Sequence, residues 1–272
     1  MRHIIPKNTQ TIKLNFDVNE ISSEDMPLES KKIAQDYLTS KTYNDEFDLI
    51  AATEDNQLIF GFEYLYKNQM RYIPELDPSV VYFSSAQLFR EKIYKYKTEL
   101  LKNSTIVIKM HENDIPLSKS MKQFETFFQF ASSYIIMLNS SLEAFINKTI
   151  PIDYKYITQT GKEKNINWIL KSAQFKTKIE EIIPDCTNKN FIKKFPKKYE
   201  SIEELKNFRN ELIHLSPKTD NTNTKYKEFY RKVIDFKYNE SIYLVRDYIN
   251  FHEENLIEEC PCDQNFHFDI NK

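Results

Sequence analysis

The chain has 272 residues, of which 40% are hydrophobic and 14% aromatic, a composition that excludes bulk disorder. Its 2 glycines exclude the P-loop and the Rossmann fingerprint, which need several glycines at fixed spacing. The formal net charge is only −2, but acidic residues dominate 17–63, whereas 186–199 holds lysines and no acidic residue. This asymmetry predicts that the second half of the chain meets a polyanion.

Residues 1–115 predict a small α+β domain, because short β-prone runs alternate with one helical pattern. The runs 47–52 and 58–66 are expected to form strands, with a turn between them, and 105–110 a further short strand. Apolar residues at near-helical spacing predict a helix over 87–102. The region shows no catalytic constellation, so we assign it a sensing or regulatory role.

From residue 118 to about 258, longer helical periods predict an α-helical bundle, followed by a C-terminal tail over 259–272. Proline residues and a capping box mark the expected helix ends. The four expected helices are 119–150, closed by Pro151; 165–183, ending at Pro184; 201–214, with Ser201 as N-cap and Glu204 completing the capping box; and 225–257.

The end of the third predicted helix carries the residues best suited to chemistry, Arg209, Asn210 and His214. A histidine titrates near neutral pH and can move a proton, an arginine can hold a phosphate with two hydrogen bonds, and an asparagine can orient either group. These side chains suffice for RNA cleavage without a metal ion, in which the 2′-hydroxyl of the RNA attacks the adjacent phosphate.

Helical geometry separates these residues. Asn210 and His214 are i, i+4 neighbours, whereas Arg209 lies about 140° from His214 around the helix axis. A two-fold dimer that brings two such helices together would let each chain supply groups to a shared cleft. The alternative is that His214 stabilises the helix C-terminus as a cation, without a chemical role.

Four segments in this order resemble the HEPN superfamily, and in particular the HEPN domains of bacterial defence and toxin systems. They are 138–147 (LNSSLEAFIN), 169–171 (ILK), 178–184 (KIEEIIP) and 205–214 (LKNFRNELIH), which ends in a full RNxxxH motif. The resemblance covers about residues 118–258. It implies a four- to five-helix bundle, a homodimer that pairs two RNxxxH helices, and metal-independent endoribonuclease activity. It also implies that Arg209 and His214 are catalytic and that Asn210 supports them.

Two further groups are candidates for contact with RNA. Glu143 lies on the first bundle helix, from which a polar residue enters the cleft of some HEPN nucleases; the alternative is a surface carboxylate. A lysine segment, interleaved with Phe191, Phe195 and Tyr199, could bind phosphates while the aromatic rings stack on bases. The rings could equally anchor a loop to the bundle. The five lysines are Lys189, Lys193, Lys194, Lys197 and Lys198.

The remaining features predict no metal, no cofactor and no membrane segment. Cys260, Cys262 and His267 lack the spacing of a four-ligand zinc site, and Cys186 is the remaining thiol, so a terminal tail is the preferred interpretation. Three cysteines fit a reducing compartment, and no apolar run reaches membrane-spanning length. A cytoplasmic location is therefore expected.

We expect a homodimeric endoribonuclease that acts on cellular RNA in antiphage defence or as a toxin, with an antitoxin or another defence protein as a candidate partner. The principal alternative is a non-catalytic HEPN-like module that binds a nucleotide, a nucleic acid or a partner protein. A purely structural bundle, in which Arg209 and His214 serve the helix end, is a third hypothesis.

Overall fold

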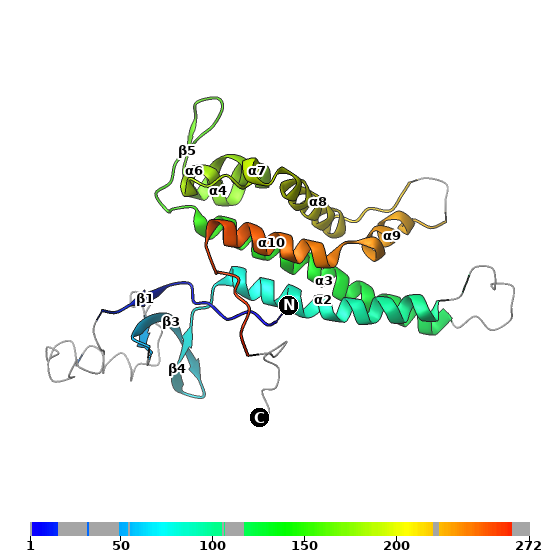
Figure 1. Cartoon of the computed structure of the whole chain (residues 1–272), viewed down its shortest axis with the longest axis horizontal. Helices are drawn as coiled ribbons and strands as arrows, with labels where there is room; N and C mark the ends of the chain where they lie inside the picture. The colour runs from blue at the N-terminus through cyan, green and yellow to red at the C-terminus, as the bar shows by residue number, and fades with distance from the viewer. Residues whose placement is uncertain are drawn as a thin grey trace. The chain divides into compact units, whose positions relative to one another are not determined.

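The computed structural model describes residues 2–15, 32, 49–53, 55–104, 106, 117–219 and 223–262. It contains two compact units, one formed by Pro6–Asp77 and the other by Met1–Ile5 together with Pro78–Lys272 (Figure 1). Helices dominate the structure and the larger strands lie near the N-terminus, as the composition of the two regions predicts. No helix in the described ranges is long and apolar enough to cross a membrane.

The small unit is an antiparallel sheet built around β3 (Gln57–Tyr66). Strands β1 (Thr11–Lys13), β2 (Leu49–Ala52) and β4 (Gln69–Pro74) all pair with β3. The predicted strands 58–66 and, in its described part, 47–52 are therefore confirmed. The predicted strand 105–110 lies almost wholly outside the described residues.

One glycine is required by this sheet. A Cβ atom on Gly61 would lie 2.5 Å from both the Ile73 carbonyl oxygen and the Tyr72 ring of the neighbouring strand. The hairpin between β3 and β4 turns through Lys67 and Asn68, which both have positive φ, as a two-residue turn of the primed type requires. Strand β4 is not among the strands predicted from the sequence.

The predicted domain boundary near residue 115 is wrong, because the first long helix belongs to the helical unit. Helix α2 (Pro78–Asn103) packs along α3 (Leu117–Thr149), and the Ser141 hydroxyl of α3 donates a 2.7 Å hydrogen bond to the Ser79 carbonyl of α2. The helix also begins well before the predicted 87, with proline in its first turn, where a missing N–H costs nothing. The boundary therefore lies at Pro78.

Helix α3 confirms the predicted helix 119–150, but the predicted helix 165–183 is broken. A two-stranded ribbon, β5 (Tyr156–Ile157) with β6 (Glu163–Lys164), precedes it. Pro184 does not end the helical run, because it occupies the first turn of α6, where proline is tolerated. The segments that replace the predicted helix are α4 (Ile166–Ser172), α5 (Phe175–Thr177), the π-helical turn η4 (Lys178–Ile182) and α6 (Ile183–Thr187).

The third and fourth predicted helices also have different bounds. Helix α8 (Pro196–Ile213) follows the short α7 (Phe191–Lys194) and begins before Ser201, whose hydroxyl instead hydrogen bonds to the Lys197 carbonyl one turn back. The predicted N-cap and capping box are therefore wrong. The expected helix 225–257 is two helices, α9 (Lys227–Asp235) and α10 (Tyr238–His252), which are separated at Phe236.

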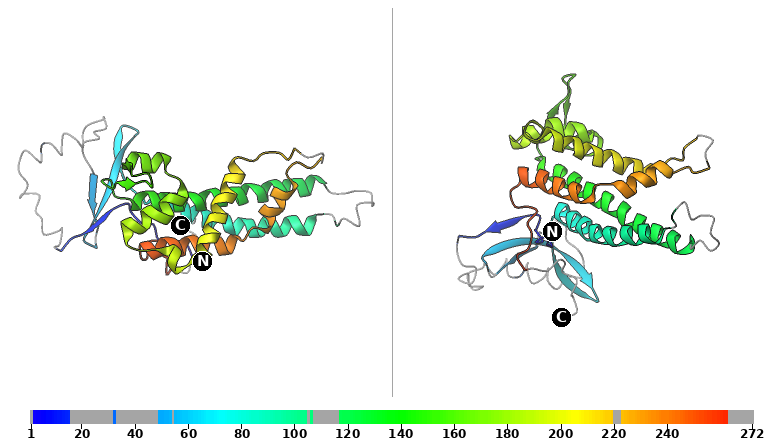
Figure 2. Two further views of the ribbon diagram at one scale, coloured as in Figure 1. Left: turned by 90° about the horizontal axis from the view of Figure 1, so that it is seen from above. Right: turned by 45° about the vertical axis from the view of Figure 1, so that its right-hand side comes forward.

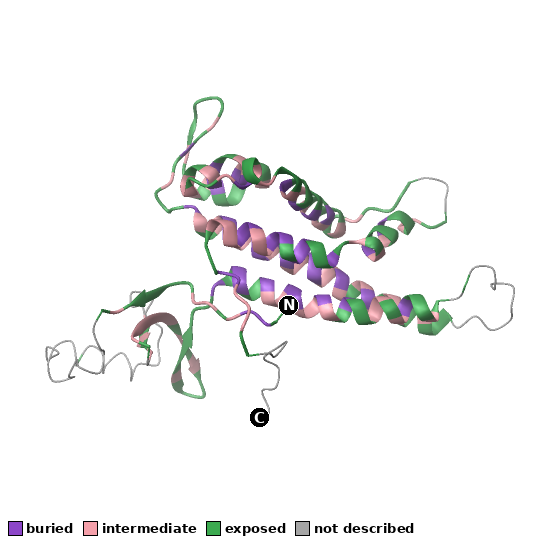
Figure 3. Ribbon diagram, viewed as in Figure 1, coloured by how far each residue is buried: buried purple, intermediate pink, exposed green. Residues whose placement is uncertain are grey.

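The core of the helical unit lies where α3, α8 and α10 face one another (Figures 2 and 3). Tyr134 of α3 is fully buried, and its hydroxyl hydrogen bonds to the Tyr238 carbonyl and the Ser241 hydroxyl of α10. Phe208 of α8 packs against the rings of Phe229 and Phe236. The inward face of α8 is thus fixed, so its end projects Arg209 and His214 in defined directions.

Residues 259–262, predicted to begin a tail, pair with the N-terminal segment instead. Ile4 forms an antiparallel bridge with Glu259, and the Cys260 amide donates a 2.8 Å hydrogen bond to the His3 carbonyl. This pairing explains why Met1–Ile5 belongs to the helical unit.

His252, at the end of α10, makes a pH-dependent contribution to stability. Burial, together with the charge of Lys189, lowers its pKa from 6.5 to about 4, and its Nε2 is buried with no partner among the described residues. The unfolded chain binds the proton more tightly, so the contribution is complete above about pH 6.5 and is lost as the pH falls toward 4. We expect a loss of about 2–3 kcal/mol over this interval.

The measurement is the free energy of unfolding by urea at pH 7 and pH 4.5, in wild type and in His252→Gln. The pH-dependent loss should be smaller in the variant by most of this amount, since glutamine does not titrate. An equal loss in both proteins would contradict the assignment to His252.

Candidate active site

Arg209 lines a pocket of about 280 Å³, which lies between α3, α8 and the segments α4 to η4. Three of its lining residues are cationic, Arg209, Lys178 and Lys206, and one is acidic, Glu143. We call this the Arg209 pocket. Its other lining residues are Ile146, Asn147, Leu170, Ala173 and Phe175. The excess of positive charge makes the pocket suited to an anion.

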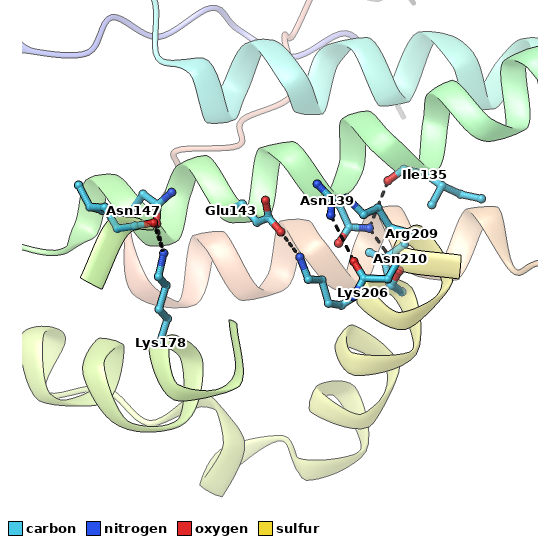
Figure 4. A network of polar contacts seen from close by, with 10 residues as sticks. Ile135, Asn139, Glu143, Asn147, Lys178, Lys206, Arg209 and Asn210 are labelled. Carbon is cyan, nitrogen blue, oxygen red and sulfur yellow. Dashed lines mark hydrogen bonds and ion pairs between the residues drawn. The ribbon is translucent and has the colours of Figure 1, made fainter. Parts of the chain in front are cut away.

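Polar side chains of α3 hold the two lysines in place (Figure 4). Glu143 forms an ion pair with Lys206 of α8, and the Asn147 Oδ1 accepts a 2.9 Å hydrogen bond from the Lys178 ammonium group. Lys178 also donates to the Leu170 carbonyl at 3.2 Å. Burial lowers the pKa of Lys178, and the nearby Lys206 adds to this effect, while Glu143 opposes it.

The guanidinium group of Arg209 is incompletely satisfied. Its Nη1 donates to the Asn210 Oδ1 at 3.2 Å, whereas its Nε is buried and has no hydrogen-bond acceptor among the described residues. A buried donor without a partner costs about 1–3 kcal/mol, and an oxyanion at this position would remove that cost. Asn210, the residue predicted to orient Arg209 or His214, thus contacts the guanidinium group of its neighbour Arg209.

Asn139 fixes the height of α8 on α3. It is 1% exposed, and its amide group donates to the carbonyls of Ile135 at 3.2 Å and Leu205 at 3.3 Å (Figure 4). Asn139, Glu143 and Asn147 recur every four residues, so they lie on one face of α3. Glu143 and Asn147 line the Arg209 pocket, whereas Asn139 contacts α8 one turn earlier.

His214 lies in a different pocket from Arg209. It is the C-cap of α8, and its backbone amide donates to the Asn210 carbonyl at 2.9 Å. Its side chain is exposed and lines a pocket of about 260 Å³, together with Glu211, Ser216, Lys218, Lys225, Tyr226 and Glu228 among others. Within one chain the two residues thus diverge, as the helical spacing predicts.

The cap at the end of α8 is formed by the backbone of His214. Among the described residues, no hydrogen bond joins the imidazole to a carbonyl of α8, and the capping contact is made by the backbone. A cation acts on the helix dipole without such a bond, so a stabilising role of His214 at the helix end stays an alternative.

The five lysines of the lysine segment differ in their contacts. Lys189 donates to the His252 carbonyl at 2.9 Å, and Lys198 forms a 2.6 Å ion pair with Asp247, so both have partners within the chain. Lys194 lies over the rings of Phe195 and Phe251. Lys193 of α7 and Lys197 in the first turn of α8 are exposed.

The aromatic residues of this segment are part of the core and do not form a base-stacking surface. Phe191 is 2% exposed and packs on Tyr248, while the Tyr199 hydroxyl hydrogen bonds to Glu180 at 2.6 Å. Phe195 packs edge to face against Phe251. The anchoring alternative is therefore the correct one, because these rings fill the space between α7, α8 and α10.

Lys178, Lys206 and Asn147 belong to the pocket but are not among the site residues predicted from the sequence. Two of them had a usable signal, since Asn147 is i+4 from Glu143 and Lys206 is i−3 from Arg209. Lys178 had no such signal, because it reaches the pocket from the π-helical turn, and no periodicity in the sequence predicts that turn.

No protein-family model matches this chain, and neither the curated proteins nor the solved structures include a match to it.

Proposed function

We propose that this protein is a metal-independent endoribonuclease, with a phosphate of the RNA bound in the Arg209 pocket and His214 supplied by a second copy of the chain. The observation that carries the proposal is that Arg209 lines one pocket with Lys178 and Lys206, and that its Nε is buried with no hydrogen-bond acceptor among the described residues. The same helix ends in an exposed histidine. The resemblance of the RNxxxH helix to HEPN nucleases supports the same chemistry.

The proposed reaction is a transesterification within the RNA. The 2′-oxygen attacks the adjacent phosphorus, its proton passes to a base, and the bond from phosphorus to the 5′-oxygen breaks as that oxygen receives a proton. His214 performs one of these proton transfers, and Arg209 stabilises the negative charge of the pentacoordinate phosphorus. The products are a 2′,3′-cyclic phosphate and a 5′-hydroxyl end.

The composition of the pocket favours catalysis by side chains over catalysis by two metal ions. Two-metal nucleases gather several carboxylates around the reacting phosphate. Among the described residues that line the Arg209 pocket, Glu143 is the sole carboxylate, and it is neutralised by Lys206. Cations of the chain therefore occupy the role that metal ions would otherwise take.

A second copy is needed because the two groups diverge. Asn210, Ile213 and His214 are exposed together at the end of α8, and Ile213 is 45% exposed although it is apolar. In the proposed dimer this end of α8 meets its equivalent about a two-fold axis, which covers Ile213 and brings His214 toward the partner's Arg209 pocket.

The direct test is incubation of the purified protein with total RNA in the presence of EDTA. Wild type should cleave, and the new 5′ ends should accept a label from polynucleotide kinase without prior phosphatase treatment, because they carry a hydroxyl. Cleavage that persists in both Arg209→Ala and His214→Ala would refute the site.

The second candidate function is a non-catalytic binding module. If the protein works as a monomer, the separation of Arg209 from His214 within one chain favours this candidate. It predicts RNA binding without cleavage. Growth on expression distinguishes the two, because an active nuclease should slow growth and its His214→Ala variant should not.

Glu143 offers a way to separate binding from catalysis. In Glu143→Gln the ion pair with Lys206 is lost while the shape is kept, so the pocket gains a positive charge. We expect tighter RNA binding, with the slope of log K against log salt becoming steeper by about 1. If Glu143 also moves a proton, kcat falls about 10²-fold or more.

Filter binding at several salt concentrations gives the slope, and single-turnover cleavage gives the rate. Glu200→Gln, an exposed change on the same helix as Lys206 and outside the residues lining the pocket, is the matched control. A salt slope equal in Glu143→Gln and wild type would mean that RNA does not enter this pocket.

A further inference from the structure

The two ends of the described chain bring three metal-ligating side chains together. The ligand atoms of His3, Cys260 and Cys262 all lie within 4.8 Å of one another. His3 is 3% exposed, Cys260 is half-buried and Cys262 is exposed, so the cluster lies at the surface with one buried side. It belongs to the helical unit, away from the residues that line the Arg209 pocket.

The three ligand atoms are close enough to surround one zinc ion after a turn of the His3 ring, which would direct a single nitrogen at the ion. Bonds of about 2.3 Å to sulfur and about 2.0 Å to nitrogen place neighbouring ligand atoms about 3.5–3.8 Å apart. The Cys262 sulfur lies 3.6 Å from the His3 Nδ1 and 3.8 Å from its Nε2. A set of two thiolates and one imidazole is typical of zinc, and three protein ligands leave a fourth position for water.

The backbone on both sides of the cluster is held in place before any ion binds. The Ile5 amide donates to the Glu258 carbonyl at 2.9 Å, and the Cys260 amide to the His3 carbonyl at 2.8 Å, which sets His3 beside the cysteines. Such preorganisation lowers the cost of gathering ligands from opposite ends of a chain.

The C-terminal segment of this pair is also bonded to α10. Arg246 forms a 3.0 Å ion pair with Glu259, and Asn250 exchanges two hydrogen bonds with the backbone of Ile257, at 2.8 and 3.0 Å. An ion bound here would therefore fasten the N-terminal segment and the C-terminal segment to the same helix.

We propose that His3, Cys260 and Cys262 bind a zinc ion that closes the helical unit by joining its two terminal segments. This site is independent of the proposed ribonuclease chemistry, and it revises the prediction that the chain holds no metal. The sequence conceals it because the histidine is 257 residues or more from both cysteines.

Cobalt(II) and zinc(II), added separately to the full chain in a thiol-free reductant, test the proposal. Wild type should bind about one ion per chain, and cobalt should give a thiolate-to-metal absorption band in the near ultraviolet. Cys262→Ser, at an exposed position, should lose about half of that band, and Cys260→Ser/Cys262→Ser should lose it entirely. Zinc should raise the Tm of wild type by several degrees and leave that of the double variant unchanged.

Cys186→Ser is the matched control, because burial raises the pKa of that thiol to about 11 and disfavours the thiolate. It should bind cobalt as wild type does, as should His214→Ala, whose loss of RNA cleavage is a separate result. Absence of the cobalt band in reduced wild type, or an undiminished band in the double variant, would overturn the zinc site without bearing on the ribonuclease proposal.

Discussion

Arg209→Ala is expected to lower the rate of RNA cleavage by about 10²–10³-fold, and His214→Ala by about 10²–10⁴-fold. Arg209 loses the charge that stabilises the transition state, and His214 loses the proton transfer. Both changes should leave the fold intact, because the half-buried Arg209 side chain makes one hydrogen bond among the described residues, to its neighbour Asn210, and the His214 side chain is exposed. The measurement is single-turnover cleavage of a labelled RNA.

Two controls make this result specific. Arg231→Ala removes an exposed arginine of α9 and should cleave at the wild-type rate. Thermal melts of Arg209→Ala and His214→Ala should stay close to that of wild type. A large loss of stability in His214→Ala, in proportion to its lost cleavage, would instead support the structural role at the helix end.

The second large effect is restoration of activity by combining two inactive chains. Arg209→Ala and His214→Ala are co-expressed with different tags and purified through both. One of the two sites in such a heterodimer joins an intact Arg209 to an intact His214 of the other chain, so we expect about half of the wild-type activity. Each variant alone should be close to inactive.

The converse pairing serves as the matched control. Wild type combined with the double variant Arg209→Ala/His214→Ala has no site with both groups if the site spans two chains, and it should be inactive. If one chain holds a complete site, this pair keeps about half of the activity and the first pair has none. The two pairings therefore give opposite results for the two arrangements.

Local patterns in the sequence were sufficient to predict the elements whose residue spacing alone indicates a helix or a strand. Helix α3 follows from an apolar stripe that Pro151 closes, and β3 from a β-prone run. The divergence of Arg209 and His214 follows from their spacing on one helix, since about 100° per residue is a property of the backbone alone. Glu143 was placed near the site by resemblance to a family, and it does line the Arg209 pocket.

Tertiary structure decided the features that depend on contacts between distant residues. The sequence of α2 predicts a helix but not its neighbour. Its position beside α3 is set by the packing of the two helices. The break between α9 and α10 coincides with Phe236, whose ring packs against that of Phe208 in α8. Lys178 reaches the Arg209 pocket through the π-helical turn, and His3 meets Cys260 through a strand pairing between the chain ends. No local pattern encodes such meetings, because their free energy comes from groups that are neighbours in space and not in sequence.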